Sequence, residues 1–229
     1  MLRLRQHKSL YAAFDLFPSA KGAATHIQHF SRQLFRSHGG GLLCVLGSQD
    51  LPVYQDLGAV EVVRFCSSTQ NVIERGLGFS SFVSGLLEKQ KTLRLCHFRD
   101  IWSGQAIVGA GGYRTLFELN GLPSIELREL YPSAPASVFS KLRQIEEHVW
   151  KMADSIVVPS EVMRTNVAHL GVPLQKVKTI HNGAEILPAF PRPDAAPTRY
   201  LVYFGALQPW QGVQVLLRAM ALLADISDL

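Results

Sequence analysis

Short apolar runs alternate with longer segments along most of the chain, and the longer segments carry apolar residues at helical spacing. The short runs have the length of buried strands, whereas each longer segment has one apolar face. In residues 23–37 this face is made of Ala23, Ile27, Phe30 and Leu34. Three consecutive glycines at 39–41 follow, which is typical of the end of a helix.

This pattern predicts seven strands and four helices before residue 186. The expected strands are residues 9–17, 41–47, 60–65, 93–98, 114–120, 154–160 and 177–183, and the expected helices are residues 23–37, 80–90, 136–153 and 160–171. Apolar strands that alternate with helices are typical of a parallel sheet covered by helices on both faces. The sequence therefore predicts an α/β fold with a doubly wound parallel sheet.

A proline-rich stretch divides the chain into two unequal parts. Residues 187–199 hold four prolines and three alanines without a hydrophobic period, so they are a predicted linker. Residues 1–186 before it are the predicted main domain, and residues 200–229 after it are the predicted start of a second one. A strand is expected there at 199–205 and a helix at 212–224. Because a βα unit of about 30 residues cannot bury its own apolar face, we expect a second domain that is truncated here.

Composition and charge narrow the function classes. With 47% hydrophobic and 18% charged residues, the chain can bury a sizeable core, which excludes wholesale disorder. The net charge of +5 suits an anionic partner, or only keeps the surface solvated. The basic residues are scattered without interleaved aromatics, so nucleic acid is not an expected partner. Arg3, Arg5 and Lys8 gather near the N-terminus, which leaves a peripheral membrane contact open.

The number of cysteines and the length of the apolar runs indicate in which cellular compartment the protein resides. Cys44, Cys66 and Cys96 each lie in an apolar, strand-like run. An odd number without paired spacing indicates reduced, buried thiols in a reducing compartment. No apolar run approaches the roughly 18 residues that span a bilayer. We therefore expect a cytoplasmic protein, with the inner face of the membrane as the alternative for a peripheral one.

Two loops that follow predicted strands hold candidate site residues, because doubly wound sheets bind ligands at the carboxyl ends of their strands. Lys21 and Gly22 precede a helix N-terminus, where backbone N–H groups could approach a phosphate or form an ordinary turn. His97, Arg99 and Asp100 follow another strand. His97 could act as a general base, bind a hydroxyl or be purely structural.

A third such loop carries Glu118 and Asn120, whose polar groups could bind sugar hydroxyls. The dinucleotide fingerprint G-x-G-x-x-G is absent after the first strand, and no nucleophile elbow, zinc-protease motif or P-loop is present. His26 and His29 lie three residues apart on the first expected helix. Two histidines alone make a weak metal site, so no metal is expected.

Three stretches of the chain, taken in order, match a known arrangement. Residues 17–34, FPSAKGAATHIQHFSRQL, resemble the first loop and helix of the family 4 glycosyltransferases. Residues 146–185 resemble that family's middle segment, in which a strand ending in Pro-Ser leads to a helix, Gly-Val-Pro and a strand ending in Asn-Gly. Residues 203–220, YFGALQPWQGVQVLLRAM, resemble the first strand, turn and helix of the family's second domain.

This resemblance implies the GT-B architecture, in which two Rossmann-like domains face each other across a cleft. The N-terminal domain binds the acceptor, a sugar or a lipid-linked sugar, and the C-terminal domain holds most of the nucleotide-sugar site. The family transfers the sugar with retention of anomeric configuration, usually without a metal. The nucleotide-sugar is thus a substrate, and no separate cofactor is expected.

The resemblance carries over to individual residues. His97 matches a polar position at the cleft, and Glu118 stands where some members carry a catalytic-site histidine, so these two are the catalytic candidates. Gly22 matches a glycine loop near the donor phosphate. The candidate substrate-binding residues are Lys21, Gly22, Arg99, Asp100, Asn120, Ser160, Arg164, Asn182 and Gly183.

The donor side is represented only by Gly205, Gln211 and Gly212. The family often has an Arg after the strand glycine and a Lys before the helix glycine, and both pair with the donor diphosphate. Here these positions are Ala206 and Gln211. Losing two cations that face a diphosphate removes charge-assisted hydrogen bonds from the donor site. The family's two acidic residues spaced eight apart, which hold the donor, would lie beyond Leu229.

Three hypotheses follow. In the first, the chain is the acceptor-side half of a retaining glycosyltransferase and transfers no sugar by itself. In the second, it is a non-catalytic binding subunit of a split glycosyltransferase, with a partner chain carrying the donor domain. In the third, it is an unrelated Rossmann-like nucleotide-binding enzyme, which the missing dinucleotide fingerprint disfavours.

Overall fold

The computed structural model describes residues 4–186, 188–195, 200–205, 207 and 211–223. Within them the strands form one eight-stranded sheet in the order β3-β4-β2-β1-β5-β6-β7-β8. Neighbouring strands pair in parallel, except that β3 pairs antiparallel with β4 at one edge. The strands are β1 (Ser9–Leu16), β2 (Gly41–Leu46), β3 (Tyr54–Leu57), β4 (Val60–Phe65), β5 (Leu95–Phe98), β6 (Arg114–Glu118), β7 (Ser155–Val158) and β8 (Val177–Thr179).

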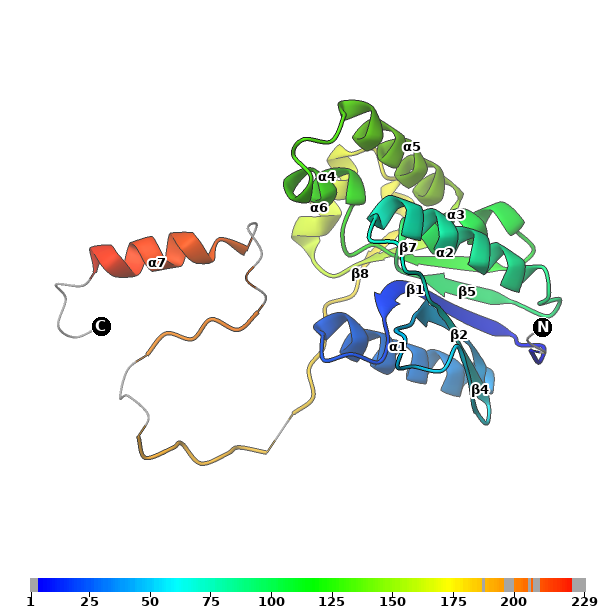
Figure 1. The fold of residues 1–229 in the computed structure, drawn as a ribbon, viewed down its shortest axis with the longest axis horizontal. Coiled ribbons are helices and arrows are strands. Elements are labelled where there is room, and N and C mark those ends of the chain that lie inside the picture. Colours follow the sequence, from blue (N-terminus) through cyan, green and yellow to red (C-terminus); the bar gives the residue numbers. More distant parts are fainter. Residues whose placement is uncertain (1–3, 187, 196–199, 206, 208–210, 224–229) are drawn as a thin grey trace.

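Helices cover both faces of the sheet, which confirms the predicted doubly wound α/β fold. Helix α1 lies on one face, and α2, α3 and α5 lie on the other (Figure 1). The described α-helices are α1 (Gly22–His38), α2 (Val72–Leu87), α3 (Ile101–Ala110), α4 (Pro123–Leu130), α5 (Ala136–Met152), α6 (Glu161–His169) and α7 (Val213–Leu222), and a short 3₁₀ helix, η1 (Leu174–Lys176), precedes β8. None of the described helices is long and apolar enough to cross a membrane.

The strand order reverses at β1. From β1 the chain proceeds through β2 and β4 toward one edge, and α2 then carries it back across the sheet to β5, on the other side of β1. Each face has its own core, the smaller of which is built around α1 by Tyr11, Ala13, Ile27, Phe35, Leu43, Val45 and Val62. Open α/β sheets bind ligands at such a reversal, at the carboxyl ends of the strands. The ends of β1 and β5 therefore mark the expected site.

A buried carboxylate holds α4 at this edge of the sheet. Residue Leu122 caps α4 without a side-chain hydrogen bond. The fully buried Glu146 of α5 supplies the missing acceptors. Its Oε1 accepts from the backbone N–H of Ser124 at 2.7 Å, and its Oε2 accepts from the Ser124 hydroxyl at 2.6 Å. An unpaired N–H group at the start of α4 is thus satisfied by a neighbouring helix.

All seven strands predicted before residue 186 are present, and four elements were missed: β3, α3, α4 and the short η1. Strand β3 is short and half-exposed, without an apolar run. Helix α3 is apolar and buried on most sides, so it has no amphipathic period. Helix α4 spans only eight residues. Helix α2 also begins well before residue 80, because the side chain of Asn71 caps it by accepting from the N–H groups of Ile73 and Glu74.

The predicted strand at 199–205 is wrong in the part that the structure describes. Residues 200–205 have no regular secondary structure, although α7 forms as expected after them. A strand needs a neighbouring strand to satisfy its backbone groups. This segment lies apart from the sheet (Figure 1), and none of the residues in α7 is buried.

The three cysteines are unpaired, as expected, but they differ in burial. Cys44 and Cys96 lie inside the sheet and have no exposed surface. Cys66 is exposed, because it follows the end of β4 where the chain leaves the sheet. The expectation of a buried thiol is therefore wrong for Cys66.

Candidate functional site

The carboxylate of Glu118 ends β6 at the carboxyl edge of the sheet. Tyr11 of β1 pairs in register with His97 of β5, and His97 pairs with Leu116 of β6. Paired residues of parallel strands point to the same face, and so does the residue two positions further along a strand. Tyr11, His97 and Glu118 therefore point together toward the face that α1 covers.

Three side chains from three elements converge on this carboxylate, which is only 3% exposed as a residue. The Nε2 of His26, from α1, lies 2.7 Å from Oε1 of Glu118. The Nε2 of His97 lies 3.2 Å from Oε2, and the hydroxyl of Tyr11 donates to the same oxygen at 3.1 Å. The ring of Phe30 stacks on His26 at 4.0 Å between centroids, which shields the contact from solvent.

Two further groups complete the surroundings of Glu118. The amide of Asn120 donates to Oε1 at 2.6 Å, and the Nε of Arg99 lies 3.8 Å from that oxygen. Burial by itself would raise the pKa of the Glu118 carboxyl, but hydrogen bonds from His26 and His97, the charge of Arg99 and the Asn120 amide outweigh it and hold the pKa well below its usual range. Glu118 is thus an ionised group fixed by five neighbours. We name Glu118, Tyr11, His26, His97, Arg99 and Asn120 the Glu118 cluster.

The N-terminus of α1 lies next to the Glu118 cluster. Gly22 is its first residue, and Lys21 caps it without a side-chain hydrogen bond. A Cβ atom on Gly22 would meet no atom within 4 Å, so space is open in front of this turn. His26 and Ala23 hold the turn in place, since the backbone oxygen of Ala23 accepts from Arg99 at 3.2 Å. Free N–H groups at a helix start favour an anion.

The structure gives Asp100 a structural role instead of a free carboxylate. One oxygen accepts from the backbone N–H of Ser103 at 2.8 Å, which caps α3, and the other accepts from the Ser103 hydroxyl at 2.7 Å and from the N–H of Phe14 at 2.8 Å. Burial raises the pKa of Asp100 to about 6. Both oxygens of Asp100 already accept hydrogen bonds from the protein. This favours a role in holding the start of α3 against β1 over direct contact with a substrate.

The predicted residues of the middle segment line the same edge, further along the sheet. The hydroxyl of Ser160 caps α6 by accepting from the N–H of Met163 at 3.1 Å. Arg164 is partly exposed and lies 3.7 Å from Glu161 one helical turn away. These contacts place Ser160 and Arg164 at the carboxyl end of β7, but outside the Glu118 cluster.

The chain after β8 then turns back toward α1. Asn182 and Gly183 are exposed and follow the end of β8. His181 contacts the backbone oxygen of Pro159 at 3.2 Å, and Glu185 lies 3.7 Å from His29 of α1. His29 therefore faces a different carboxylate from its neighbour His26, and the two histidines do not share a ligand. Asn182 and Gly183 lie between these two contacts.

The donor-side residues lie apart from the Glu118 cluster. Gly205, Gln211 and Gly212 belong to the separate segment that carries α7 (Figure 1). Gly212 caps α7 with a φ of 69°, a left-handed conformation that favours glycine. Ala206, the other position noted in the sequence, lies outside the described residues. The structure therefore does not bring the predicted donor residues to the acceptor-side edge.

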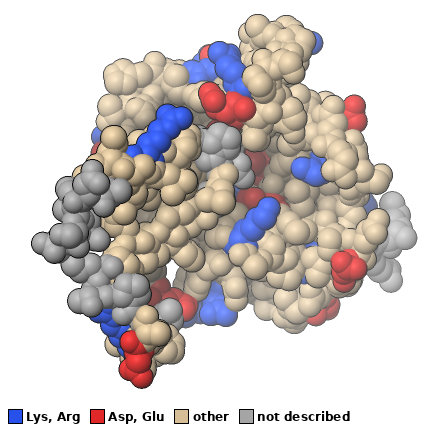
Figure 2. Space-filling model, turned by 60° about the vertical axis from the view of Figure 1, so that its left-hand side comes forward, with Lys and Arg blue, Asp and Glu red and all other residues tan. Residues whose placement is uncertain are grey.

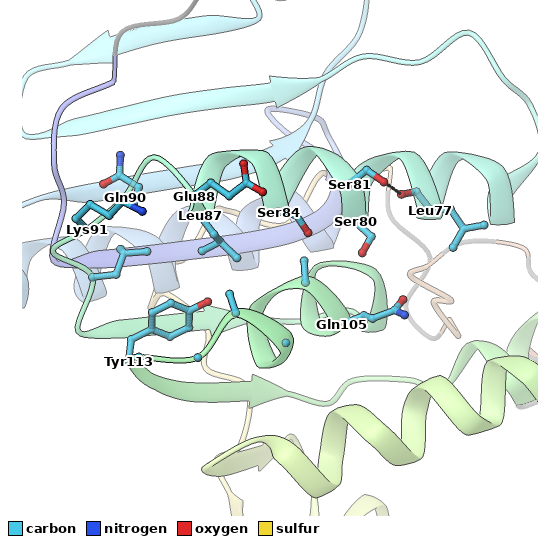
Figure 3. A pocket seen from close by; sticks show the side chains of 16 residues that line it. Leu77, Ser80, Ser81, Ser84, Leu87, Glu88, Gln90, Lys91, Gln105 and Tyr113 are labelled. Atoms are coloured by element: carbon cyan, nitrogen blue, oxygen red, sulfur yellow. Dashed lines mark hydrogen bonds between the residues drawn. The ribbon is translucent and has the colours of Figure 1, made fainter.

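A cavity of about 290 Å³ borders the Glu118 cluster. Its walls come from the end of β1, the loop between β5 and α3, the turn after β6 and the first turn of α4, and both Arg99 and Asn120 line it. A larger cavity of about 830 Å³ lies between α2 and α3 (Figure 3). Serines of α2 and small residues of α3 line that one, and it extends toward the amino ends of the strands. The smaller cavity is therefore the better candidate for the ligand site, because it lies at the carboxyl ends of the strands and next to the Glu118 cluster.

The basic residues do not form one surface. On the face that Figure 2 shows, the described lysines and arginines are scattered among acidic and uncharged residues. Near the N-terminus, Arg5 lies 2.8 Å from Asp56 and 3.5 Å from Glu61, so its charge is already balanced. Arg3 lies outside the described residues.

Two members of the Glu118 cluster are missed by the sequence pattern. The pattern marks Tyr11 only as an apolar strand residue, and His26 only as a weak metal ligand. A signal is present for His26, because it follows Gly22 by one helical turn and must therefore face the same loop edge. The signal for Tyr11 is its place in the central strand, but the pairing that aligns it with His97 needs the register.

Comparison with solved structures shows the fold. The chain is similar to sucrose-phosphate synthase from Thermosynechococcus elongatus, with 14% identity, a TM-score of 0.56, and coverage of 79% of this chain and 49% of that one. It is also similar to the lipopolysaccharide outer core galactosyltransferase WaaB, with 12% identity, a TM-score of 0.53, and coverage of 82% and 50%. The chain therefore spans about half the length of these GT-B proteins.

A comparison with curated proteins finds no match. The model of Glycosyltransferase Family 4 matches residues 20–186, which include the end of the loop after β1, the Glu118 cluster apart from Tyr11, and all strands from β2 to β8. This range is well over half of the 229 residues. The resemblance noted at residues 17–34 and 146–185 is confirmed over this range, whereas the stretch at 203–220 lies outside it and stays a prediction. The chain belongs to glycosyltransferase family 4.

Proposed function

We propose that this chain provides the acceptor side of a sugar transfer from a nucleotide-sugar, with retention of anomeric configuration. The observation that carries the proposal is the Glu118 cluster, which joins a buried carboxylate to the free N-terminus of α1 at the reversal of strand order. In such a transfer an acceptor hydroxyl bonds to the anomeric carbon while the bond from this carbon to the nucleoside diphosphate breaks. The site must therefore bind hydroxyls and stabilise a diphosphate.

Different residues of the described site can bind the hydroxyls and stabilise the diphosphate. The N-terminal turn of α1, with Lys21 and Gly22, offers backbone N–H groups and a cation to the diphosphate. His26, which is 18% exposed, and Asn120 can contact sugar hydroxyls. Glu118 positions both of them, because the Asn120 amide donates to its Oε1 and the Nε2 of His26 lies 2.7 Å from the same oxygen. His97 is almost fully buried, so it supports Glu118 in preference to touching the sugar.

The donor side must come from a second domain. Apolar side chains are exposed among the described residues of the segment at 200–222, and they include Leu201, Val202, Phe204, Leu216, Leu217 and Met220. Exposed apolar surface of this kind marks a contact with another protein surface. We propose that these residues pack inside a donor-binding domain, and that the 229 residues alone transfer no sugar. The domain division at 187–199 is part of this proposal.

A split enzyme is the second candidate, and the same exposed segment favours it. In that arrangement the chain is a binding subunit, and a partner chain covers residues 200–222 and supplies the donor site. The third hypothesis, a nicotinamide-dependent Rossmann-like enzyme, has no supporting observation, because the loop after β1 lacks the glycine fingerprint. We further propose that the transfer needs no metal ion, so a chelator should leave its rate unchanged.

The test compares three samples: the 229-residue chain, the protein encoded by its complete reading frame, and any complex isolated with a co-purifying partner. Each is assayed for release of nucleoside diphosphate from UDP-, GDP- and ADP-sugars with a panel of sugar acceptors, with and without EDTA. We expect transfer by the complete protein or the complex, and none by the 229 residues. Failure of every sample on every donor, or tight binding of a nicotinamide cofactor, would contradict the proposal.

A further inference from the structure

The cavity beside the Glu118 cluster has an aromatic wall and a polar wall. Phe14 at the end of β1 and Trp102 of α3 line it, with their ring centroids 6.0 Å apart. Asn120 and Glu126 line it from the turn after β6 and from α4. Its volume of about 290 Å³ admits one sugar ring rather than an oligosaccharide.

Glu126 is an exposed carboxylate that lines this cavity and has unused hydrogen-bond acceptor capacity. It follows the start of α4, and its carboxylate packs directly over Gly121, where a Cβ atom would overlap its Oε1. Among the described residues no hydroxyl, amide or cationic side chain contacts this carboxylate, and the backbone of Leu122 is the hydrogen-bonding group beside it. Partial dehydration by the surrounding protein raises the pKa of Glu126. A carboxylate can accept about four hydrogen bonds, so beside the one from Leu122 it can accept others from hydroxyl groups of a ligand, which would replace water.

The charges around the cavity disfavour an anionic ligand. Its acidic residues are Asp15, Asp100 and Glu126, and its cation is Arg99. The charge of Arg99 is already shared, because its Nε lies 3.7 Å from Asp15 and 3.8 Å from Glu118, and its Nη1 donates to a backbone oxygen. A ligand phosphate or carboxylate would therefore face net negative charge.

One other cation lies near the aromatic wall. The guanidinium of Arg75 lies over the Phe14 ring, 5.6 Å from its centroid, and its Nε is buried. Arg75 is not among the residues that line the cavity, so its charge is directed at the ring. If it instead served an anionic ligand, phosphorylated sugars would bind better than neutral ones, and the experiment below includes them for this reason.

The amide of Asn120 connects the cavity to the Glu118 cluster. Asn120 lines the cavity and donates to Glu118 at 2.6 Å. A hydroxyl bound in the cavity would thus contact the same amide that the cluster orients. This places a bound sugar next to the groups that the proposed function assigns to the transfer.

We propose that this cavity binds one uncharged sugar ring of the acceptor, that Glu126 accepts hydrogen bonds from its hydroxyls, and that the half-buried Phe14, backed by the buried Trp102, packs against its C–H surface. That the bound sugar is the acceptor rests on the proposed function, but the binding of a sugar to the cavity can be measured without any transfer. It makes Glu126 a specificity-determining residue, selecting hydroxyl-rich neutral sugars over phosphorylated or carboxylated ones.

The experiment measures binding of methyl glycosides of glucose, galactose, mannose and N-acetylglucosamine, and of the 6-phosphates of the same sugars, to the 229-residue chain by saturation-transfer NMR. The variants are Glu126→Gln and, as a matched control, Glu129→Gln, which lies one turn further along α4, is exposed like Glu126, and does not line the cavity. We expect at least one neutral glycoside to bind, a loss of about 10-fold or more in affinity for Glu126→Gln, and a change below about twofold for Glu129→Gln. Circular dichroism confirms that both variants fold.

Three results would overturn the inference: no neutral glycoside binds, Glu126→Gln binds as well as the unchanged chain, or a 6-phosphate binds more tightly than its neutral parent. These results are separate from the test of the proposed function. If the complete protein transfers sugar, but Glu126→Gln leaves glycoside binding to the cavity unchanged, only the assignment of the cavity is refuted. Glycoside binding that depends on Glu126, without any nucleotide-sugar turnover, refutes only the transferase proposal.

Discussion

The Nε2 of His26 and the Oε1 of Glu118 lie 2.7 Å apart, which joins the second turn of α1 to the end of β6. Strand β5 lies between β6 and the strand that leads into α1. The contact therefore bridges the reversal of strand order and fixes the start of α1 relative to the carboxyl edge. A ligand held by the N-terminus of α1 would be held in a fixed position relative to the cavity next to Glu118.

His26 and His29 allow this contact to be tested with a matched pair. His26→Leu removes the polar group beside a buried carboxylate, and we expect it to lower the free energy of unfolding by about 1–3 kcal/mol. His29→Leu removes a contact of 3.7 Å between side chains that are largely exposed, so a change of about 0.5 kcal/mol or less is expected. Urea unfolding of the 229-residue chain measures both. Equal effects of the two substitutions would show that the His26 contact is not formed.

Glu118→Gln tests the proposed role of the Glu118 cluster in transfer. The substitution keeps the shape of the side chain but removes the charge that orients His26 and Asn120. In the complete protein or complex we expect kcat to fall by about 100-fold, which is typical of a lost positioned polar group. We expect KM for the nucleotide-sugar to change little, because the N-terminus of α1 is left in place. A variant with unchanged kcat would remove Glu118 from the proposed site.

The pKa of Glu118 also predicts how stability depends on pH. The pKa is held below its unfolded value of about 4.3, so the ionised group stabilises the fold above that pH. This stabilisation is lost as pH falls below about 4, toward the folded-state pKa. The difference in unfolding free energy between the unchanged chain and Glu118→Gln should therefore shrink as the pH is lowered from about 5 to about 3. Urea unfolding at several pH values measures it, and a constant difference would contradict the assignment.

The sequence predicted which loops hold the site residues better than it predicted the contacts among these residues. The carboxyl-end rule alone located His97, Arg99, Glu118 and Asn120, and the structure brings all four together. Asp100 was located by the same rule but caps α3, because a carboxylate directly before a helix has N–H groups within reach. A rule for loop positions cannot distinguish a capping carboxylate from a free one.

The missed features depend on neighbours that are distant in the sequence. Tyr11 joins the Glu118 cluster through strand register, and the start of α4 is satisfied by a carboxylate on α5. The strand expected at 199–205 has apolar residues of the right kind, but a strand forms only where another strand can pair with it. The local pattern of residues predicts which secondary structure a segment can form, but the segment forms a strand only where a neighbouring strand pairs with it.

The buried carboxylate of Glu146 should contribute more to stability than its neighbour Glu147. Glu146→Ala leaves the backbone N–H and the hydroxyl of Ser124 without their acceptors, so we expect a loss of about 3 kcal/mol in unfolding free energy. Glu147→Ala removes partly exposed ion pairs with Arg143 and Lys151 and should cost about 0.5 kcal/mol or less. Because Glu146 positions α4, its loss should also weaken glycoside binding in the cavity. Urea unfolding compares the two variants, and strong destabilisation by Glu147→Ala instead would contradict this account.

The exposed apolar segment near α7 gives a test of the second domain. Phe204 is 99% exposed and Leu217 is 65% exposed, so the double variant Phe204→Ser and Leu217→Ser should change the unfolding free energy of the 229-residue chain by about 0.5 kcal/mol or less. It should also reduce the binding of a hydrophobic dye. In the complete protein or a complex the same two side chains should be buried, and the variant should then cost about 3 kcal/mol or more, or release the partner.

Val162→Ser serves as the control for this comparison, because Val162 of α6 is 70% exposed but belongs to the α/β domain. It should have little effect in either sample. If the double variant also has little effect in the complete protein or the complex, the segment at 200–222 is not covered there. The donor side would then have to be sought on another surface, since an acceptor-side edge without a facing domain cannot enclose the transferred sugar.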